Sequence, residues 1–302
     1  MKKFLNLLLL FCLPILVIGC SMEFLLRQIP NAYQIKSNYL IENKDSIQTL
    51  LVGSSHVLYG INPDFLTDKA LNYGNVSQTI DIDYDIVSQY ITELQALSTV
   101  VLRWSYTTPF EQLKKGDERW RLKDYAIYTT VHTETKLKYH FEMFSVKLKY
   151  NIERLYNYYI LKKEIEHTNT SGWSMHMDAS KLVNLETLGE RIAKKHTAIT
   201  DNYYTENVNI LERIVKMCNK HNINVLLVTM PAYHSYVNKL DTLQLRKTID
   251  AGVNMQQQYE NCRYFNLLND KRFDKQDFID VDHLNATGAE KFSKLIDSLL
   301  TQ

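Results

Sequence analysis

The amino-acid sequence predicts an α/β fold in which a parallel β-sheet is covered by helices on both faces. Short apolar runs, typical of buried strands, alternate along the chain with longer amphipathic stretches, typical of helices. Short turns separate them, and this alternation is the pattern of parallel sheets. The chain has 302 residues, of which 45% are hydrophobic and 23% charged, so it can bury a full core.

The first residues predict attachment to a membrane. Lys2 and Lys3 precede an uncharged run from Phe4 to Met22. Its length is close to the roughly 20 residues that span a bilayer, and the lysines favour an N-terminus inside the cytoplasm. We therefore expect residues 1–26 to be a signal anchor or a lipoprotein signal, and residues 27–302 to form a domain outside the cytoplasm, in the cell envelope.

Two interpretations of this leader stay open. Val17-Ile18-Gly19-Cys20 resembles the bacterial lipoprotein cleavage site, which would make Cys20 the lipidation site. Alternatively, Cys20 lies inside an uncleaved transmembrane helix that continues through Phe24-Leu25-Leu26. Beyond the leader only Cys218 and Cys262 remain, which predicts two free buried thiols and no zinc site made of four cysteines.

Five strands and four helices follow the leader. The predicted strands are 48–52, 70–73, 98–104, 224–229 and 264–267. The predicted helices are about 81–96, 203–221, 240–259 and 285–300. Sites in such sheets lie beyond the carboxyl ends of the strands. The residues that follow the first four strands should therefore share one edge: Ser55, Gly74, Ser105 and Pro231.

A segment from about residue 110 to residue 200 interrupts the alternation. Its runs Lys136–Phe144 and Lys147–Lys163 have the spacing of amphipathic helices, so we expect a helical insertion seated above the strand ends. One interpretation is a lid or an acceptor-binding cap. Another is a solvated helical excursion, and the abundance of tyrosine and lysine also suits a membrane surface.

A serine and a distant Asp-x-x-His motif provide the candidate chemistry. Ser55 lies in Gly53-Ser54-Ser55-His56 after the first strand, and Asp280-Val281-Asp282-His283 precedes the last helix. A serine hydroxyl needs a base to take its proton and a carboxylate to orient that base. Ser55, His283 and Asp280 would fill these roles, whereas Asp282 should point elsewhere. Alternatively, the acidic motif only introduces the last helix, because Asn285-Ala286-Thr287-Gly288 is typical of a helix start.

These blocks, together with Gly74 in Asn72-Tyr73-Gly74-Asn75, resemble those of the SGNH/GDSL hydrolases. The resemblance covers about 46–110 and 203–300. It implies a flavodoxin-like three-layer α/β/α fold with strand order 2-1-3-4-5. It also implies that Ser55 is the nucleophile, His283 the base and Asp280 the orienting acid, with the backbone amides of Ser55 and Gly74 in the oxyanion hole. Ser54 replaces the family's usual aspartate, as in the envelope branch that resembles the D-alanyl-lipoteichoic acid transfer protein and polysaccharide O-acetylation proteins.

The third block departs from the family pattern. The family commonly has Gly-x-Asn-Asp after strand three, whereas this chain has Leu102-Arg103-Trp104-Ser105-Tyr106-Thr107. An asparagine donor to the oxyanion is typically worth roughly 10²- to 10³-fold in rate. Ser105 is the candidate replacement, although it can equally be a residue that only ends the strand. Three further residues are candidates for substrate binding: His56, Asn75 and Tyr233.

The expected function is that of a serine esterase or O-acyltransferase acting on acyl groups, such as acetyl, of a cell-surface glycan or another ester. No cofactor or metal is expected, and a membrane-bound acyltransferase is a candidate partner. Thirty-five basic and 34 acidic residues leave a net charge of +1, which gives no sign of nucleic-acid binding. The main alternative is a non-catalytic SGNH-like protein that binds glycan or scaffolds such an acyltransferase. A phosphate-binding module is disfavoured, because the turn after strand one has too little glycine.

Overall fold

The centre of the computed structural model, which describes residues 1–133, 135–175 and 184–301, is a five-stranded sheet. Its strands lie in the order β2-β1-β3-β4-β5, and every neighbouring pair is parallel. This arrangement confirms the predicted flavodoxin-like α/β fold, including the strand order that the resemblance implied. The strands are β1 (Thr49–Val52), β2 (Ala70–Asn72), β3 (Thr99–Arg103), β4 (Asn224–Thr229) and β5 (Cys262–Asn266).

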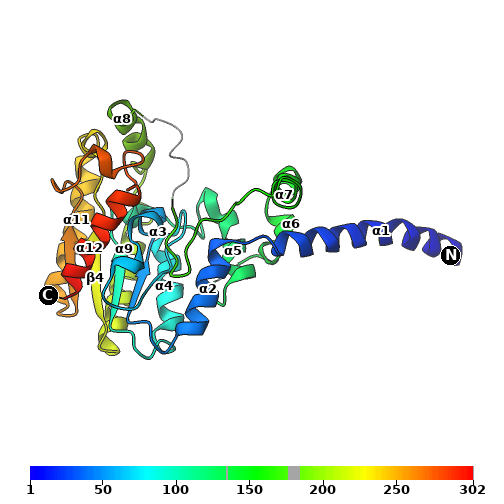
Figure 1. Cartoon of the computed structure of the whole chain (residues 1–302), viewed down its shortest axis with the longest axis horizontal. Coiled ribbons are helices and arrows are strands. Elements are labelled where there is room, and N and C mark those ends of the chain that lie inside the picture. Colours follow the sequence, from blue (N-terminus) through cyan, green and yellow to red (C-terminus); the bar gives the residue numbers. More distant parts are fainter. Residues whose placement is uncertain (134, 176–183, 302) are drawn as a thin grey trace.

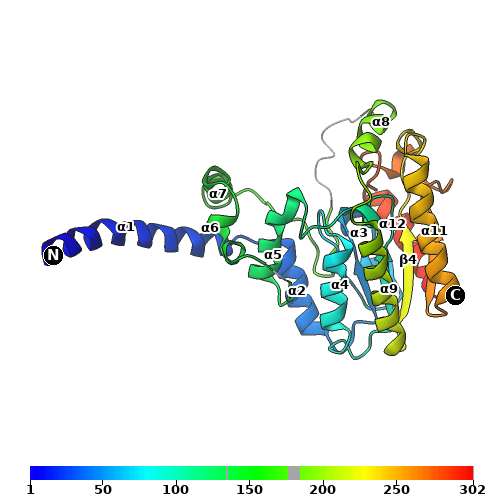
Figure 2. The ribbon, with the colours of Figure 1, turned by 180° about the vertical axis from the view of Figure 1, so that it is seen from behind.

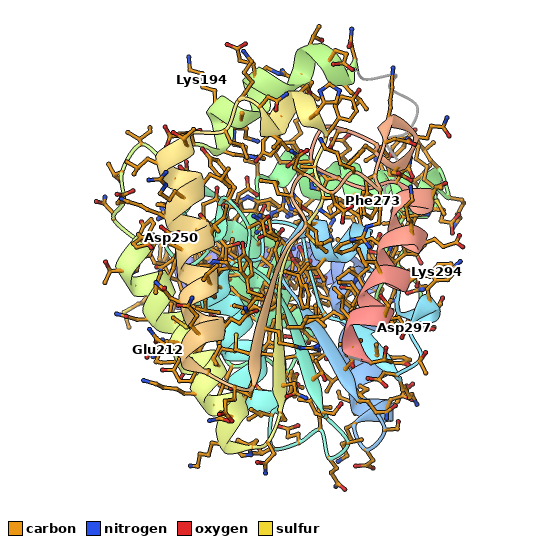
Figure 3. All side chains as sticks on the ribbon, turned by 90° about the vertical axis from the view of Figure 1, so that its left-hand side faces the viewer. Lys194, Glu212, Asp250, Phe273, Lys294 and Asp297 are labelled. Carbon is orange, nitrogen blue, oxygen red and sulfur yellow. The ribbon has the colours of Figure 1, made fainter. Side chains whose placement is uncertain are left out.

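Helices cover both faces of the sheet, because successive strand residues point to opposite sides. Leu50 and Leu102 belong to one buried core, and Leu51 and Val101 belong to the other. Figure 3 shows α9 and α11, marked by Glu212 and Asp250, on one side, and α12, marked by Lys294, on the other. The first core is covered by α4 (Ile80–Tyr90), α9 (Tyr204–Lys220) and α11 (Thr242–Gln258), and the second by α3 (Ser55–Gly60) and α12 (Ala286–Leu300).

Several element boundaries differ from the prediction. Helix α4 ends at Tyr90, before the predicted residue 96, because the chain turns there and buries Leu94 and Leu97. Strand β5 begins at Cys262, earlier than predicted. The membrane-proximal segment contains an unpredicted helix, α2 (Ala32–Asn43), whose start is capped by the Asn31 side chain. Both Cys218 and Cys262 are buried with free thiols.

The helices of the segment that interrupts the alternation lie in two separate parts of the molecule (Figure 1). Helices α5 (Leu122–Tyr128), α6 (Glu142–Ser145) and α7 (Leu148–Leu155) lie toward the N-terminal helix, whereas α8 (Leu185–His196) lies near the carboxyl ends of the strands. The predicted amphipathic helix at 136–144 is wrong, because Leu137–His140 forms a 3₁₀ turn and only α6 is α-helical. The run 147–163 contains α7 and a following π-helical turn, Tyr156–Ile160.

The N-terminal helix α1 (Lys2–Arg27) projects from the domain (Figure 1). It is long and apolar enough to cross a membrane, and Cys20 is exposed on it.

The outer edge of the sheet at strand β2 is partly covered by the insertion. The backbone amide of Asn72 in β2 donates to the Ser171 carbonyl at 2.9 Å.

Candidate active site

Ser55, His283 and Asp280 form a chain of hydrogen bonds beyond the carboxyl end of β1. Ser55 is the first residue of α3, and His283 lies in the loop before α12. Ser55 Oγ lies 2.8 Å from His283 Nε2. On the other side of the imidazole ring, His283 Nδ1 lies 3.0 Å from Asp280 Oδ2. The fold therefore brings together the three residues that the sequence singled out, in the order nucleophile, base and orienting acid.

The loop around Asp280 explains why this spacing works. Asp280 Oδ1 accepts hydrogen bonds from the backbone amides of Asp282 and His283, at 3.0 and 2.8 Å. The Ile279 amide donates to the His283 carbonyl, so the turn closes on itself. Asn285 caps α12 through its side chain, which accepts from the Gly288 amide. The motif thus both introduces the last helix and orients the histidine.

The expectation that Asp282 points elsewhere is wrong. Its Oδ1 lies 3.5 Å from His283 Nδ1, and the side chain is buried. The closed turn directs both carboxylates toward the same ring. Asp282 Oδ2 also lies 3.3 Å from His56 Nε2 and 3.7 Å from His196 Nδ1, so one carboxylate faces three imidazoles.

This grouping controls the charge of the histidines. Burial lowers the pKa of His283, but the negative charge of Asp282 and the hydrogen bond to Asp280 outweigh it and raise the pKa to about 9. Burial alone would raise the pKa of Asp282, yet the charge of His283 and the bond from His56 bring it below its usual range. Burial lowers the pKa of His56 to about 3, helped by the positive charges of Arg103 and His283. His56 is therefore neutral at physiological pH.

A second serine and histidine stand beside the first pair. Ser54 Oγ lies 3.0 Å from His56 Nδ1, and His56 Nε2 faces Asp282, so Ser54, His56 and Asp282 repeat the residue types of the first array. The ligand atoms of His56, Asp282 and His283 all lie within 4.8 Å of one another, a spacing that could hold a metal ion. A metal held by His283 Nδ1 would have to displace the hydrogen bond from that nitrogen to Asp280.

The other expected site residues lie outside this grouping. The amide of Gly74 donates to Asn72 Oδ1 at 3.0 Å, and the amide of Ser105 donates to Thr108 Oγ1 at 3.1 Å. Asn75 is buried and donates to the Tyr73 carbonyl, and the Tyr233 hydroxyl donates to Glu186. None of the four predicted residues Gly74, Asn75, Ser105 and Tyr233 is among the lining residues of the cavity at Ser55.

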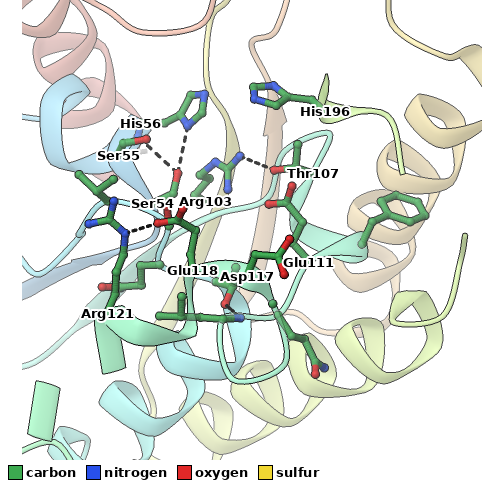
Figure 4. A pocket seen from close by; sticks show the side chains of 18 of the residues that line it. Ser54, Ser55, His56, Arg103, Thr107, Glu111, Asp117, Glu118, Arg121 and His196 are labelled. Atoms are coloured by element: carbon green, nitrogen blue, oxygen red, sulfur yellow. Dashed lines mark hydrogen bonds and ion pairs between the residues drawn. The ribbon is translucent and has the colours of Figure 1, made fainter. Parts of the chain in front are cut away.

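That cavity has a volume of about 700 Å³ and lies between the strand ends and the insertion (Figure 4). Ser54, Ser55 and His56 line it on one side, and residues of the insertion line it on another, including Arg121, Lys195 and His196. Sequence reasoning missed Arg103 and His196 in this cavity. Arg103 had a usable signal, since it lies near the end of the predicted strand 98–104, whose carboxyl end faces the site.

The sequence matches no protein-family model, and it matches no curated protein. One similar solved structure is a protein from Streptococcus pneumonia, provisionally described as a platelet activating factor, with 11% identity, a TM-score of 0.44 and coverage of 94% of this chain and 98% of that chain. Another is a protein from Bacteroides fragilis, provisionally named an acylhydrolase, with 10% identity, a TM-score of 0.45 and coverage of 88% and 93%. The chemistry of the site is therefore inferred from its own geometry.

Proposed function

We propose that this protein is a membrane-anchored serine esterase or O-acyltransferase that acts outside the cytoplasm on acyl groups of a cell-surface glycan. The observation that carries the proposal is the hydrogen-bonded chain from Ser55 through His283 to Asp280, which opens into a cavity. An isolated serine hydroxyl is a weak nucleophile, and this arrangement supplies the base and the orienting carboxylate that it needs.

The reaction would begin with attack of Ser55 Oγ on the acyl carbonyl carbon. His283 Nε2 takes the hydroxyl proton, and Asp280 holds the ring through Nδ1. As the tetrahedral intermediate collapses, the leaving alcohol receives that proton and the acyl group stays on Ser55. Water or a sugar hydroxyl then gives its proton to His283 and attacks the acyl-serine. Hydrolysis and transfer share every step up to this second attack.

A hydroxyl-rich substrate suits the lining of the cavity. Ser77, Asp117 and Lys195 line it with half-buried or exposed polar side chains, so it offers donors and acceptors. Sugars bind through such groups. A membrane-bound acyltransferase, which the resemblance implies as partner, would supply the acyl group in the transfer reaction.

The region around the end of α1 supports anchoring at a membrane surface. Glu23 of α1 accepts the amides of Glu142 and Met143 at 3.0 Å each, and Arg27 donates to the His140 carbonyl at 2.7 Å. These bonds fix α6 beside α1, as Figures 1 and 2 show. Closer to the N-terminus of α1, a Cβ atom at Gly19 would lie 3.6 Å from Met143 Cε, so α6 also touches the apolar part of α1.

Exposed apolar side chains surround this junction. We call them the apolar collar: Leu137, Phe141, Phe144, Leu148, Ile152, Tyr156, Ile160 and Leu161. Water would penalise such a patch, whereas the interface of a bilayer that contains α1 would bury it. Lysines of the same segment, such as Lys147 and Lys149, suit the anionic lipid headgroups. We therefore assign the collar to the membrane surface, one of the three roles considered for the insertion.

Labelling with a fluorophosphonate probe tests the function, because the probe reacts with activated serines. We expect labelling of the wild type and of Ser54→Ala, and no labelling of Ser55→Ala. Ser54→Ala is the matched control, since it removes the neighbouring hydroxyl from the same turn. A folded wild-type protein that the probe does not label would favour the non-catalytic scaffold instead.

A further inference from the structure

Arg103 places a guanidinium without a direct ion-pair partner among the described residues in the cavity at Ser55. It is the last residue of β3, its side chain is only 6% exposed, and it lines the cavity with Ser55 and His283. Among the described residues, Thr107 is its hydrogen-bond partner, whose Oγ1 accepts from Nη2 at 2.9 Å, and its buried Nε has no partner there. Within the described parts of the chain, no carboxylate forms an ion pair with it. Burial lowers the pKa of Arg103, but an arginine keeps its charge in proteins.

A buried cation without a counter-ion is costly, and folds keep one where an anion arrives during function. Arg121 provides the contrast within the same cavity. Its Nε lies 2.7 Å from Glu118 Oε2, so its charge is already balanced. Glu111 also lines the cavity, but burial raises the pKa of its carboxyl, which weakens it as a permanent partner for Arg103.

The backbone next to the nucleophile is adapted to Arg103. Gly53 has a φ of +144°, and a Cβ atom there would lie 2.7 Å from Arg103 Cβ. Only glycine therefore allows the turn that carries Ser55 to pass so close to the arginine. Figure 4 shows the guanidinium between this turn and Thr107.

Two of the groups first expected to bind the oxyanion, the backbone amides of Gly74 and Ser105, have other partners. The Gly74 amide donates to Asn72, and the Ser105 amide donates to Thr108. The asparagine usual after strand three in the resembling family has no counterpart here. Arg103 stands at the end of that same strand with a free buried N–H.

We propose that Arg103 is a further catalytic residue, whose guanidinium binds the negatively charged oxygen of the tetrahedral intermediate. This inference rests on the proposed function. When Ser55 Oγ bonds to the carbonyl carbon, the carbonyl π electrons move to the oxygen, which becomes an oxyanion. Arg103 donates hydrogen bonds to that oxyanion without transferring a proton. The oxyanion then re-forms the carbonyl and expels the alcohol, which takes its proton from His283.

The test compares Arg103→Gln with the wild type on two p-nitrophenyl esters, the neutral acetate and the hemisuccinate, whose acyl group carries a carboxylate. We expect kcat to fall by about 10²- to 10³-fold on both esters, with KM nearly unchanged, as for loss of one oxyanion donor. Arg246→Gln, at an exposed position of α11 outside the cavity, is the control and should stay within about twofold of wild type.

Two results would overturn the inference. One is a kcat of Arg103→Gln within about threefold of wild type on the acetate. The other is a loss confined to the hemisuccinate, which would mean that Arg103 binds a carboxylate of the substrate. If Arg103→Gln does not fold, as judged by circular dichroism, Arg103→Lys decides. It keeps the charge but not the N–H fork, and we expect at least a tenfold lower kcat; an unchanged kcat contradicts the proposal.

Probe labelling separates this inference from the function on which it rests. Without Ser55-dependent labelling of the wild type, the proposed function and the role of Arg103 both fall. With Ser55 labelled normally and Arg103→Gln fully active on the acetate, only the role of Arg103 falls.

Discussion

The imidazole rings of His56 and His283 stack with their centroids 4.5 Å apart and their planes at 27°. Asp282 contacts both rings, yet their pKa values are displaced in opposite directions. The ring that bonds to Ser55 also bonds to Asp280, whereas burial and the positive charges of Arg103 and His283 lower the pKa of the ring that bonds to Ser54. The histidines of two adjacent Ser-His pairs therefore have very different pKa values, about 3 for His56 and about 9 for His283.

Activity should rise with pH. His283 must be neutral to accept the Ser55 proton, and its pKa is raised to about 9, so kcat/KM should increase up to that pH. Asp282→Asn removes the negative charge that raises the pKa, and should shift the midpoint down by roughly 1–3 units. The rate of ester hydrolysis, measured between pH 5 and 10, gives this midpoint. Asp117→Asn, in the same cavity, is the control, and equal midpoints in wild type and Asp282→Asn would contradict this account.

Asp280→Asn should have a different effect. The amide cannot hold the His283 ring in the tautomer that accepts the Ser55 proton, so we expect kcat to fall by roughly 10²- to 10⁴-fold. Asparagine keeps a side-chain oxygen for the amides of Asp282 and His283, so the fold should persist. Steady-state kinetics measures the loss of activity, and a thermal melting curve shows whether the fold persists. A kcat like that of the wild type would remove Asp280 from the mechanism.

Gly53→Ala should destabilise the fold. The alanine Cβ would lie 2.7 Å from Arg103 Cβ and 2.8 Å from Val57 Cγ2, at a backbone φ of +144° that side chains rarely adopt. We expect a loss of about 1–3 kcal/mol in the free energy of unfolding. Urea denaturation measures this loss, and Ser98→Ala, at an exposed position, serves for comparison. A variant as stable as wild type would show that the turn has room for a side chain.

Lys36 predicts a second pH dependence, in stability. Its side chain is fully buried and its Nζ donates to the Gly74 carbonyl, and burial lowers its pKa to about 7. An unfolded lysine titrates near 10.4, so between about pH 7 and 10 the unfolded chain binds more protons and stability rises with pH. The contribution is at most about 1.4 kcal/mol per pH unit.

Lys36→Met removes this titration. Urea denaturation of both proteins at several pH values should give a smaller rise in stability for Lys36→Met across that window. The difference between the two curves cancels the other titrating groups, which both proteins share. Parallel curves would mean that Lys36 titrates in the folded protein as it does in water.

The apolar collar predicts where lipid contacts the domain. In full-length protein reconstituted into vesicles with anionic lipid, a tryptophan at Ile152→Trp should be quenched by brominated lipid, after subtraction of the wild-type signal. Ile199 is more exposed than Ile152 but lies away from α1, between α8 and α9, so Ile199→Trp should not be quenched. Equal quenching at both positions would exclude the collar as the membrane-facing surface.

The sequence predicts the framework of this site well and its electrostatics poorly. Ser55 and His283 meet because parallel strands end at one edge, a rule that needs only the order of the elements. The contribution of Asp282 depends on the closed turn between Ile279 and His283, which no periodicity reveals. In the sequence, Arg103 is one residue of an apolar strand. Only the structure reveals that it lies against Gly53, next to Ser55.

The insertion illustrates the same limit. Its helical runs are visible in the sequence, but the side toward which each one packs depends on contacts made far along the chain. Glu23 of α1 holds the start of α6 and Arg27 holds the turn before it, and nothing in the spacing of residues 136–144 indicates those partners. The unpredicted helix α2 delivers Lys36 to the Gly74 carbonyl in the same way.

The hydrogen bond from the Asn72 amide to the Ser171 carbonyl has a consequence for crowding. Strand β2 is an outer strand of the sheet, and outer strands with free amides can pair with the same strand of another molecule and aggregate. Molecules tethered by α1 to one membrane would meet often and in similar orientations. By occupying this amide, the insertion removes one donor that a second chain would need to extend the sheet at this edge.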